Sequence, residues 1–304
     1  MSRTVLCVVE LDNYPEQVVA RAAWLAKLHD CDLELVLSDP AMNYLGESFV
    51  YFAELQMLQD SVTAEQEGRL QELADSAGKG GVTVRTSISH ERPEADMVID
   101  KAEECDAILV VKGTHWHTPS ERASFAYTDW RLIRRLERPL WFVKPVEWRE
   151  KPVIIAAVDP THAKDPEHKV DHAIVNTAQE LAEKCDGKVL LLHTYQRLEE
   201  IGTRATWAFK PVKLPIDEID RKITEEHHKA LETFAAKCSI DEEAVHQLPG
   251  RAHEILPMFA RSNGSDLVVM GGVARSRLKR RVGSTAAQVL DHLPCDVLIV
   301  HAYP

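Results

Sequence analysis

The strongest constraint on this chain of 304 residues is that one pattern of strands and helices occurs in it twice. Short runs of aliphatic and β-branched residues alternate with segments whose apolar residues recur at helical spacing. Such uniformly apolar runs are typical of parallel strands covered on both faces. The expected strands are Val5–Val9, Leu33–Leu37, Val82–Thr86, Ala107–Val111 and Leu140–Val143 in the first half, and Val153–Val158, Val189–Leu192, Ala244–Gln247, Leu267–Met270 and Val297–Val300 in the second.

Helical segments are expected between these strands, and they too occur in matching positions of the two halves. The closing segments align without a gap, so that Thr128 falls on Thr285, Leu132 on Val289 and Val143 on Val300. The expected helices are Glu16–Leu28, Glu47–Ala77, Pro93–Glu104 and Thr128–Leu136, matched by Asp171–Lys184, Ile216–Lys237, Ala252–Ser262 and Thr285–Leu293.

The fold class follows from this order. Each half reads β-α-β-α-β-α-β-α-β, which predicts two tandem flavodoxin/Rossmann-like α/β domains, each a five-stranded parallel sheet with helices on both faces. The expected domains are residues 1–148 and 149–304, because a short polar stretch with prolines, Lys144–Pro152, separates the halves. A connection this short predicts that the two domains pack on each other as a pseudo-dimer.

Charge and composition exclude several classes of protein. The formal net charge is −12, and an acidic chain repels the phosphate backbone, so nucleic acid is not an expected partner. No apolar stretch approaches the roughly 18 residues of a membrane span, and the first residues contain no signal-peptide core. The six cysteines are scattered without a CxxC pair, which is typical of reduced thiols in a cytoplasmic protein.

Residues that could hold a ligand gather where the second half ends its first and fourth strands. Ligands of open α/β sheets bind at the carboxyl ends of such strands. Glycines allow close backbone approach, a helix N-terminus offers free N–H groups, and the five cations from Arg275 to Arg281 attract phosphate. The candidate ligand-binding residues are Asp159, Gly271, Gly272, Arg275, Gly283, Ser284 and Thr285.

This constellation resembles the universal stress protein family. Its nucleotide-binding members carry G-x-x-G, nine residues and then G-S or G-T, with an Asp after the first strand. By position, Asp159 matches that Asp, Gly271 the first glycine, and Gly283-Ser284 the closing pair. In the first half, Thr128-Asp129-Trp130 with the later Arg135, Pro139, Trp141, Val143, Lys144 and Trp148 is similar to the tandem E-type branch of that family.

The resemblance implies a non-enzymatic, cytoplasmic stress-response protein that requires no cofactor and takes ATP or another phosphate-bearing ligand. The sequence departs from the family pattern at Ala274, which replaces the second glycine, and residues 275–282 are one fewer than the pattern has. In the first half, Glu10 replaces the Asp, and Gly113-Thr114-His115-Trp116-His117 and Tyr127-Thr128 replace the glycine motifs. The first half is therefore expected to bind no nucleotide.

The sequence also allows other functions and another reading of the basic stretch. The basic stretch also fits a solvated turn with Ser284 as an ordinary N-cap. A second function is an ATP-binding or slowly ATP-hydrolysing switch. A third is a carrier of an apolar small molecule in an inter-domain cavity, although an interface explains the same side chains. Those apolar side chains are Met42, Tyr44, Leu45, Phe49, Val50, Tyr51, Phe52, Leu55, Met57 and Leu58, with Trp207, Phe209, Val212, Leu214 and Ile216 in the second half.

Catalytic and metal-binding motifs are not found. The sequence has no G-x-S-x-G elbow, Walker A loop or H-E-x-x-H motif, so no catalytic residue is assigned. His115 and His117 near Asp129 are too few ligands for a metal site. His162, Asp165, His168 and His172 could cluster beside Asp159, but solvated histidines are expected in this polar loop, and His227-His228 is expected on an exposed helix face.

Overall fold

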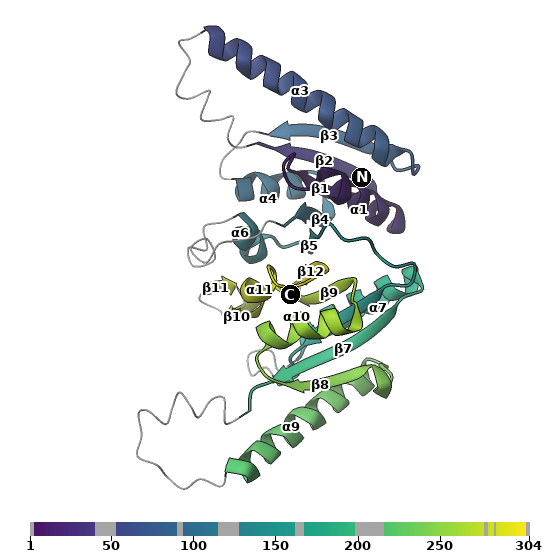
Figure 1. Cartoon of the computed structure of the whole chain (residues 1–304), viewed down its shortest axis with the longest axis vertical. Coiled ribbons are helices and arrows are strands. Elements are labelled where there is room, and N and C mark those ends of the chain that lie inside the picture. Colours follow the sequence, from purple (N-terminus) through teal and green to yellow (C-terminus); the bar gives the residue numbers. More distant parts are fainter. Residues whose placement is uncertain are drawn as a thin grey trace. The chain divides into compact units, whose positions relative to one another are not determined.

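The computed structural model describes residues 3–39, 53–89, 94–114, 128–161, 167–197, 216–276, 279–282 and 284–301. The chain divides into two compact units, Met1–Glu147 and Trp148–Pro304, one residue before the boundary that the sequence suggests (Figure 1). Trp148 belongs with the second unit, because its indole Nε1 donates to Asp296 Oδ2 at 3.2 Å.

The first unit is a parallel sheet in the order β3-β2-β1-β4-β5 with helices between its strands. Helix α1 packs against α3, and α4 packs against α6. Helix α3 runs along the edge strand β3 (Figure 1). Its elements are β1 (Thr4–Val9), α1 (Pro15–Leu28), β2 (Asp32–Ser38), α3 (Ala53–Gly78), β3 (Val84–Ser89), α4 (Glu94–Glu104), β4 (Ala107–Gly113), α6 (Thr128–Arg135) and β5 (Leu140–Val143).

The second unit repeats this topology, with its strands in the order β8-β7-β6-β9-β12. Helix α9 lies along the edge strand β8, as α3 does along β3 (Figure 1). Its elements are β6 (Val153–Val158), α7 (Lys169–Cys185), β7 (Lys188–Tyr195), α9 (Ile216–Lys237), the 3-10 turn η1 (Glu242–Ala244), β8 (Val245–Pro249), α10 (Ala252–Asn263), β9 (Leu267–Gly271), β10 (Val273–Ser276), β11 (Lys279–Val282), α11 (Ser284–Val289) and β12 (Asp296–Val300).

The expected fold class is confirmed in both units. All six residues of β1 are buried, because a central strand of this sheet has helices on both faces. The edge strand β3 begins at Val84 rather than Val82, since its polar, partly exposed residues carry no apolar run that would mark its bounds. No helix among the described residues has both the length and the apolar character of a membrane span.

Strands β10 and β11 were not predicted from the sequence. The basic stretch, expected as a loop, contains an antiparallel hairpin in which Val273 pairs with Val282 and Ser276 with Lys279. This pairing places Ala274 opposite Arg281, where the family pattern would have a glycine-spaced turn. A β-ladder imposes extended backbone on these residues, so their local geometry differs from that of a glycine turn.

Candidate functional site

Each unit has one switch point, where the strand order reverses and two neighbouring strands leave their carboxyl ends side by side. In the first unit these strands are β1 and β4, and in the second they are β6 and β9. Connections leave such a pair toward opposite faces of the sheet and open a crevice between them, which is where ligands of open α/β folds bind. The two switch points of this chain differ sharply in chemistry.

Three charged side chains fill the switch point of the first unit. The ammonium group of Lys112 lies 2.7 Å from Glu10 Oε2 and 3.3 Å from Asp129 Oδ1. The side chain of Lys112 is 1% exposed and that of Asp129 is 0% exposed. Glu10, Lys112 and Asp129 form what we term the Lys112 triad, an ion cluster held almost entirely out of water.

Local structure explains why these residues meet. Glu10 directly follows β1, Lys112 is the penultimate residue of β4, and Asp129 lies in the first turn of α6. A carboxylate in the first turn is favoured by the free N–H groups and the dipole of the helix. Asn13 holds Glu10 in place, because its Nδ2 donates to Glu10 Oε2 at 2.9 Å. Asn13 also packs against Gly113, where a Cβ would lie 2.6 Å from Asn13 Nδ2.

Electrostatics make this site unfavourable for an anion. Burial alone lowers the pKa of Lys112, but the carboxylates of Asp129, Glu10 and Glu94 outweigh it and raise that pKa above its ordinary value. Glu94 is the first residue of α4, and its carboxylate accepts from Thr128 Oγ1, at the start of α6, at 2.8 Å. Among the described residues, the three carboxylates that act on Lys112 outnumber its ammonium group, which disfavours an incoming phosphate.

The second unit carries different side chains at the same register positions. Val8 of β1 pairs with Lys112, and the matching Ala157 of β6 pairs with Met270. Ala286, which is buried, takes the position of Asp129 in the alignment of the closing helices. Only the carboxylate after the first strand recurs, as Asp159.

Asp159 is accessible to a ligand. Its side chain is 55% exposed, and its Oδ1 accepts from Thr161 Oγ1 at 2.7 Å. The backbone N–H of Asp159 donates to Asp171 Oδ1 at 3.0 Å, which ties the end of β6 to the start of α7. The carboxylate therefore sits on a fixed backbone and faces solvent.

The two candidate glycines are needed for packing. A Cβ on Gly271 would lie 2.7 Å from Val170 Cγ1, and one on Gly272 would lie 2.5 Å from Ile299 Cγ2. These distances are shorter than side chains tolerate, so Gly271 allows the start of α7 to approach β9, and Gly272 allows β12 to do so. Their presence is explained by the fold without a ligand.

The other candidate residues lie along one continuous segment. Arg275 is in β10, and Ser284 and Thr285 open α11, while Gly283 lies outside the described residues. The register of β6 with β9 brings the end of β6 beside Gly271, from which this segment departs. Asp159, Gly271 and Gly272 thus meet at the switch point.

Comparison with known proteins identifies the family. The model of the universal stress protein family matches residues 1–144 and again residues 153–301. The chain belongs to the universal stress protein family. Two matches in one chain confirm the tandem organisation, and stress response is the role associated with this family.

Relatives extend over both universal stress protein domains. Universal stress protein E of Salmonella typhi is 25% identical over 309 residues, which cover 99% of this chain and 94% of the relative. The universal stress protein E homolog of Haemophilus influenzae is 23% identical, with 97% and 96% covered. The predicted resemblance to the tandem E-type branch is confirmed.

Solved structures support the same fold. A putative universal stress protein of Pseudomonas aeruginosa UCBPP-PA14 matches with a TM-score of 0.70 at 22% identity, covering 98% of this chain and 93% of its own. A universal stress protein of Archaeoglobus fulgidus matches with a TM-score of 0.63 at 13% identity, covering 98% and 96%.

A pair of histidines beside Asp159 was missed by sequence reasoning. His193 Nδ1 lies 3.1 Å from the carbonyl oxygen of Val158, and His193 Nε2 lies 2.7 Å from His227 Nδ1. The prediction that His227 lies on an exposed face is wrong, because it stacks between His193 and Tyr195, with ring centroids 5.0 and 5.2 Å away. His228 is exposed as expected, since adjacent helical residues point in different directions.

The expected solvation of His168 and His172 is also wrong. Both rings are half-buried against Phe234 of α9, with centroid distances of 5.9 and 5.0 Å. His115, His117, His162 and Asp165 lie outside the described residues. Over the described part of the chain, no cluster of three His, Cys, Asp or Glu side chains could hold a metal ion.

The apolar residues considered for a carrier function lie mostly outside the described residues, at 42–52 and 207–214. Of the rest, Met57 and Leu58 on α3 are 71% and 49% exposed. A site for an apolar ligand at these residues stays a prediction.

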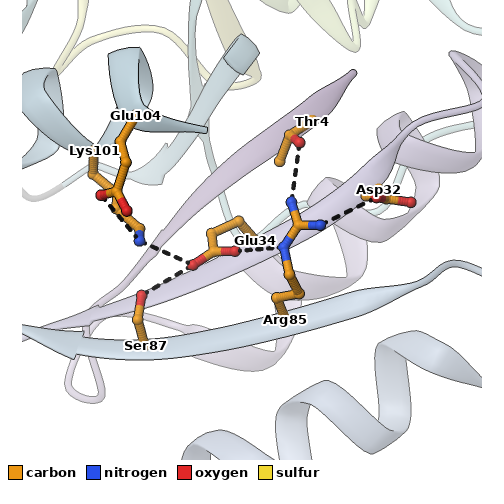
Figure 2. A network of polar contacts seen from close by, with 7 residues as sticks. All are labelled: Thr4, Asp32, Glu34, Arg85, Ser87, Lys101 and Glu104. Carbon is orange, nitrogen blue, oxygen red and sulfur yellow. Dashed lines mark hydrogen bonds and ion pairs between the residues drawn. The ribbon is translucent and has the colours of Figure 1, made fainter. Parts of the chain in front are cut away.

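A second ionic network lies toward the amino ends of the strands of the first unit (Figure 2). Glu34 of β2 accepts from Arg85 Nε at 3.0 Å and from Ser87 Oγ at 3.1 Å, and Lys101 Nζ lies 3.4 Å away. Arg85 also donates to Asp32 and Thr4, as the dashed lines of Figure 2 show. Its members bind one another and hold the edge strand β3 to β2, which indicates a structural role.

Proposed function

We propose that this tandem universal stress protein is a non-enzymatic stress-response protein of the cytoplasm whose second unit binds a phosphate-bearing ligand, with ATP as the first compound to test. The first unit is proposed to bind none. In this proposal the second unit senses the ligand, and the first keeps the same fold without one.

The difference between the two switch points carries this proposal. In the first unit, the Lys112 triad occupies the crevice and surrounds its single ammonium with carboxylates. In the second, Met270 and Ala286 stand at the equivalent positions, and Asp159 faces solvent. A ligand hydroxyl can donate to Asp159, whose side chain is 55% exposed.

Positive charge near the second switch point supports the choice of a phosphate group. Five cations lie between Arg275 and Arg281 in a chain whose formal net charge is −12. They lead in sequence into Ser284, the first residue of α11, and into the hydroxyl-bearing Ser284 and Thr285. The hairpin around Ala274 differs from a glycine-spaced turn, so we propose the phosphate group, rather than a whole triphosphate, as the recognised feature.

Anion-dependent stability tests the proposal. Phosphate and sulfate should raise the melting temperature of the full chain more than chloride at matched ionic strength, and ATP should bind in a calorimetric titration. Arg280→Glu with Arg281→Glu should remove both effects. The control is Arg221→Glu with Lys222→Glu, which reverses two exposed charges on α9 and should leave both effects in place.

Three results would contradict the proposal. The first is an equal response of the unmutated chain to all three anions without ATP binding. The second is ATP hydrolysis that disappears in the Arg280→Glu, Arg281→Glu variant, since this would make the protein an enzyme. The third is a hydrophobic molecule found bound by native mass spectrometry of freshly purified protein, which would favour the carrier function.

A further inference from the structure

The two histidines beside the second switch point form a hydrogen-bond chain with a defined direction. The carbonyl oxygen of Val158 can only accept, so Nδ1 of His193 carries the hydrogen of their 3.1 Å contact. In a neutral ring, Nε2 is then the acceptor. The hydrogen of its 2.7 Å contact therefore belongs to His227 Nδ1. The chain runs from α9 through His193 to the end of β6, one residue before Asp159.

The surroundings of this pair are specific. Asp159 approaches from the end of β6, with its Oδ1 4.0 Å from His193 Nδ1, and its charge acts on both rings. From α7, Asp171 accepts from the backbone N–H of Asp159. On β7, Tyr195 stacks on His227, and its hydroxyl lies 3.2 Å from Thr224 Oγ1. From β8, the uncharged Gln247 pairs with His193 in register.

We propose that His193 and His227 act as an acid-sensitive pair that controls Asp159, so that acidification weakens ligand binding by the second unit. This inference rests on the proposed function and adds its regulation. The side chain of His193 is 1% exposed, whereas that of His227 is half-buried, so a proton from solvent enters at Nε2 of His227. The hydrogen on Nδ1 of His227 then moves along the hydrogen bond to Nε2 of His193, which leaves Nδ1 of His227 as the acceptor.

Protonation changes what Asp159 can do. An imidazolium on His193 places a positive charge close to Asp159, because His193 Nδ1 lies 4.0 Å from Asp159 Oδ1. The half-exposed carboxylate, whose Oδ1 also accepts from Thr161 Oγ1, is then attracted to the imidazolium and accepts less readily from a ligand hydroxyl. His193 is thus a positioning residue, which acts on the ligand through Asp159.

The direction of the pKa values agrees with this geometry. Burial lowers the pKa of His193 and of His227 below the ordinary histidine value of 6.5. Both rings are therefore neutral at neutral pH, as the hydrogen-bond chain requires. The unfolded chain takes up these protons first, so the stability contributed by the neutral pair is present above 6.5 and is lost as the pH falls through the folded pKa values.

The test is a calorimetric titration of the full chain with ATP at about pH 7.5 and about pH 5.5. The dissociation constant of the unmutated chain should rise roughly fivefold more on acidification than that of His193→Gln. Titration of ATP itself is common to both proteins and cancels in this ratio. The control is His228→Gln, which changes an exposed histidine next to His227 on α9 and should behave like the unmutated chain.

A measurement without ligand separates the two proposals. The NMR chemical shift of the Asp159 side-chain carboxyl carbon should respond when the histidine pair is protonated, and His193→Gln should remove this response. Its presence supports the pair even if ATP does not bind, in which case the proposed function alone fails. Its absence in the unmutated chain, or an equal acid response of binding in His193→Gln, overturns the pair and leaves the proposed function standing.

Discussion

The two units place different chemistry on one backbone plan. In the first, the switch point holds Glu10, Lys112 and Asp129 in a buried ion cluster. In the second, the same positions hold Asp159, Met270 and Ala286. Three positions thus distinguish a switch point with a buried ion cluster from one with a single half-exposed carboxylate.

The same contrast appears at a second position. Leu6 of β1 pairs with Glu34, and the matching Ile155 of β6 pairs with Leu190. Glu34 anchors the network of Figure 2, whereas Leu190 is an ordinary buried side chain. The first unit uses paired charges where the second uses apolar packing, which shows that a parallel sheet accepts either solution if every buried charge has a partner.

The largest effect is expected from breaking the Lys112 triad. Lys112→Met, which copies the second unit, should lower the free energy of unfolding by about 3–5 kcal/mol, because it removes a cation that pairs with the buried carboxylates of Glu10 and Asp129. Denaturant titration followed by circular dichroism measures this change.

Two variants sharpen that result. Met270→Leu, at the equivalent position of the second unit, should cost less than about 1.5 kcal/mol. Adding Asp129→Ala to Lys112→Met should recover part of the loss, since a buried carboxylate that faced Lys112 is removed. A loss of less than about 1 kcal/mol in Lys112→Met would show that the cluster does not stabilise the first unit.

A smaller loss is expected at the second switch point. Gly271→Ala should destabilise the protein by about 1–3 kcal/mol, because the new methyl group overlaps Val170 Cγ1. Combining it with Val170→Ala should cost less than the sum of the two single changes, as a denaturant-based double-mutant cycle can measure. Strict additivity would mean that close packing is not what requires this glycine.

The network of Figure 2 provides a comparison away from the switch points. Glu34→Leu, which again copies the second unit, should cost about 1–2 kcal/mol, because Arg85 is half-exposed and can recover solvation. Leu190→Ile is the matched change in the second unit. A loss for Glu34→Leu as large as that for Lys112→Met would contradict the distinction between the partly solvated network and the buried triad.

The smallest expected effect is the loss of stability of the first unit at alkaline pH. The pKa of Lys112 lies above its ordinary value of 10.5 in the folded state, so its contribution to stability is present below 10.5 and declines as the pH rises toward the folded pKa. Unfolding curves at increasing pH should show a steeper loss in the unmutated chain than in Lys112→Met. Parallel curves would contradict the assignment of a raised pKa.

Strand and helix order could be predicted from the sequence. Strands such as β1 and β6 are continuous apolar runs, and the helices between the strands have apolar residues at helical spacing. The contacts that distinguish the units could not. Lys112 follows an apolar run, and only the register of β4 with β1 brings it to Glu10. His193 likewise follows an apolar run within β7, and its partner lies 34 residues away on α9. The hairpin of β10 and β11 lacks the apolar alternation that would have marked it.

The predicted packing of the halves as a pseudo-dimer stays a prediction, as do the ligand roles of Arg275, Gly283, Ser284 and Thr285. The difference between the two switch points depends neither on the pseudo-dimer packing nor on these ligand roles. It rests on contacts within each unit, such as that of Lys112 with Glu10 and that of Thr161 with Asp159.

Hydrogen–deuterium exchange of the full chain with and without ATP tests the central claim most directly, because it reports on both units in one sample. We predict added protection in peptides that cover residues 157–161 and 270–289, with no change in peptides that cover residues 9–14, 110–114 and 128–132. Protection confined to the first unit, or equal protection in both, would contradict the assignment of the ligand site to the second unit.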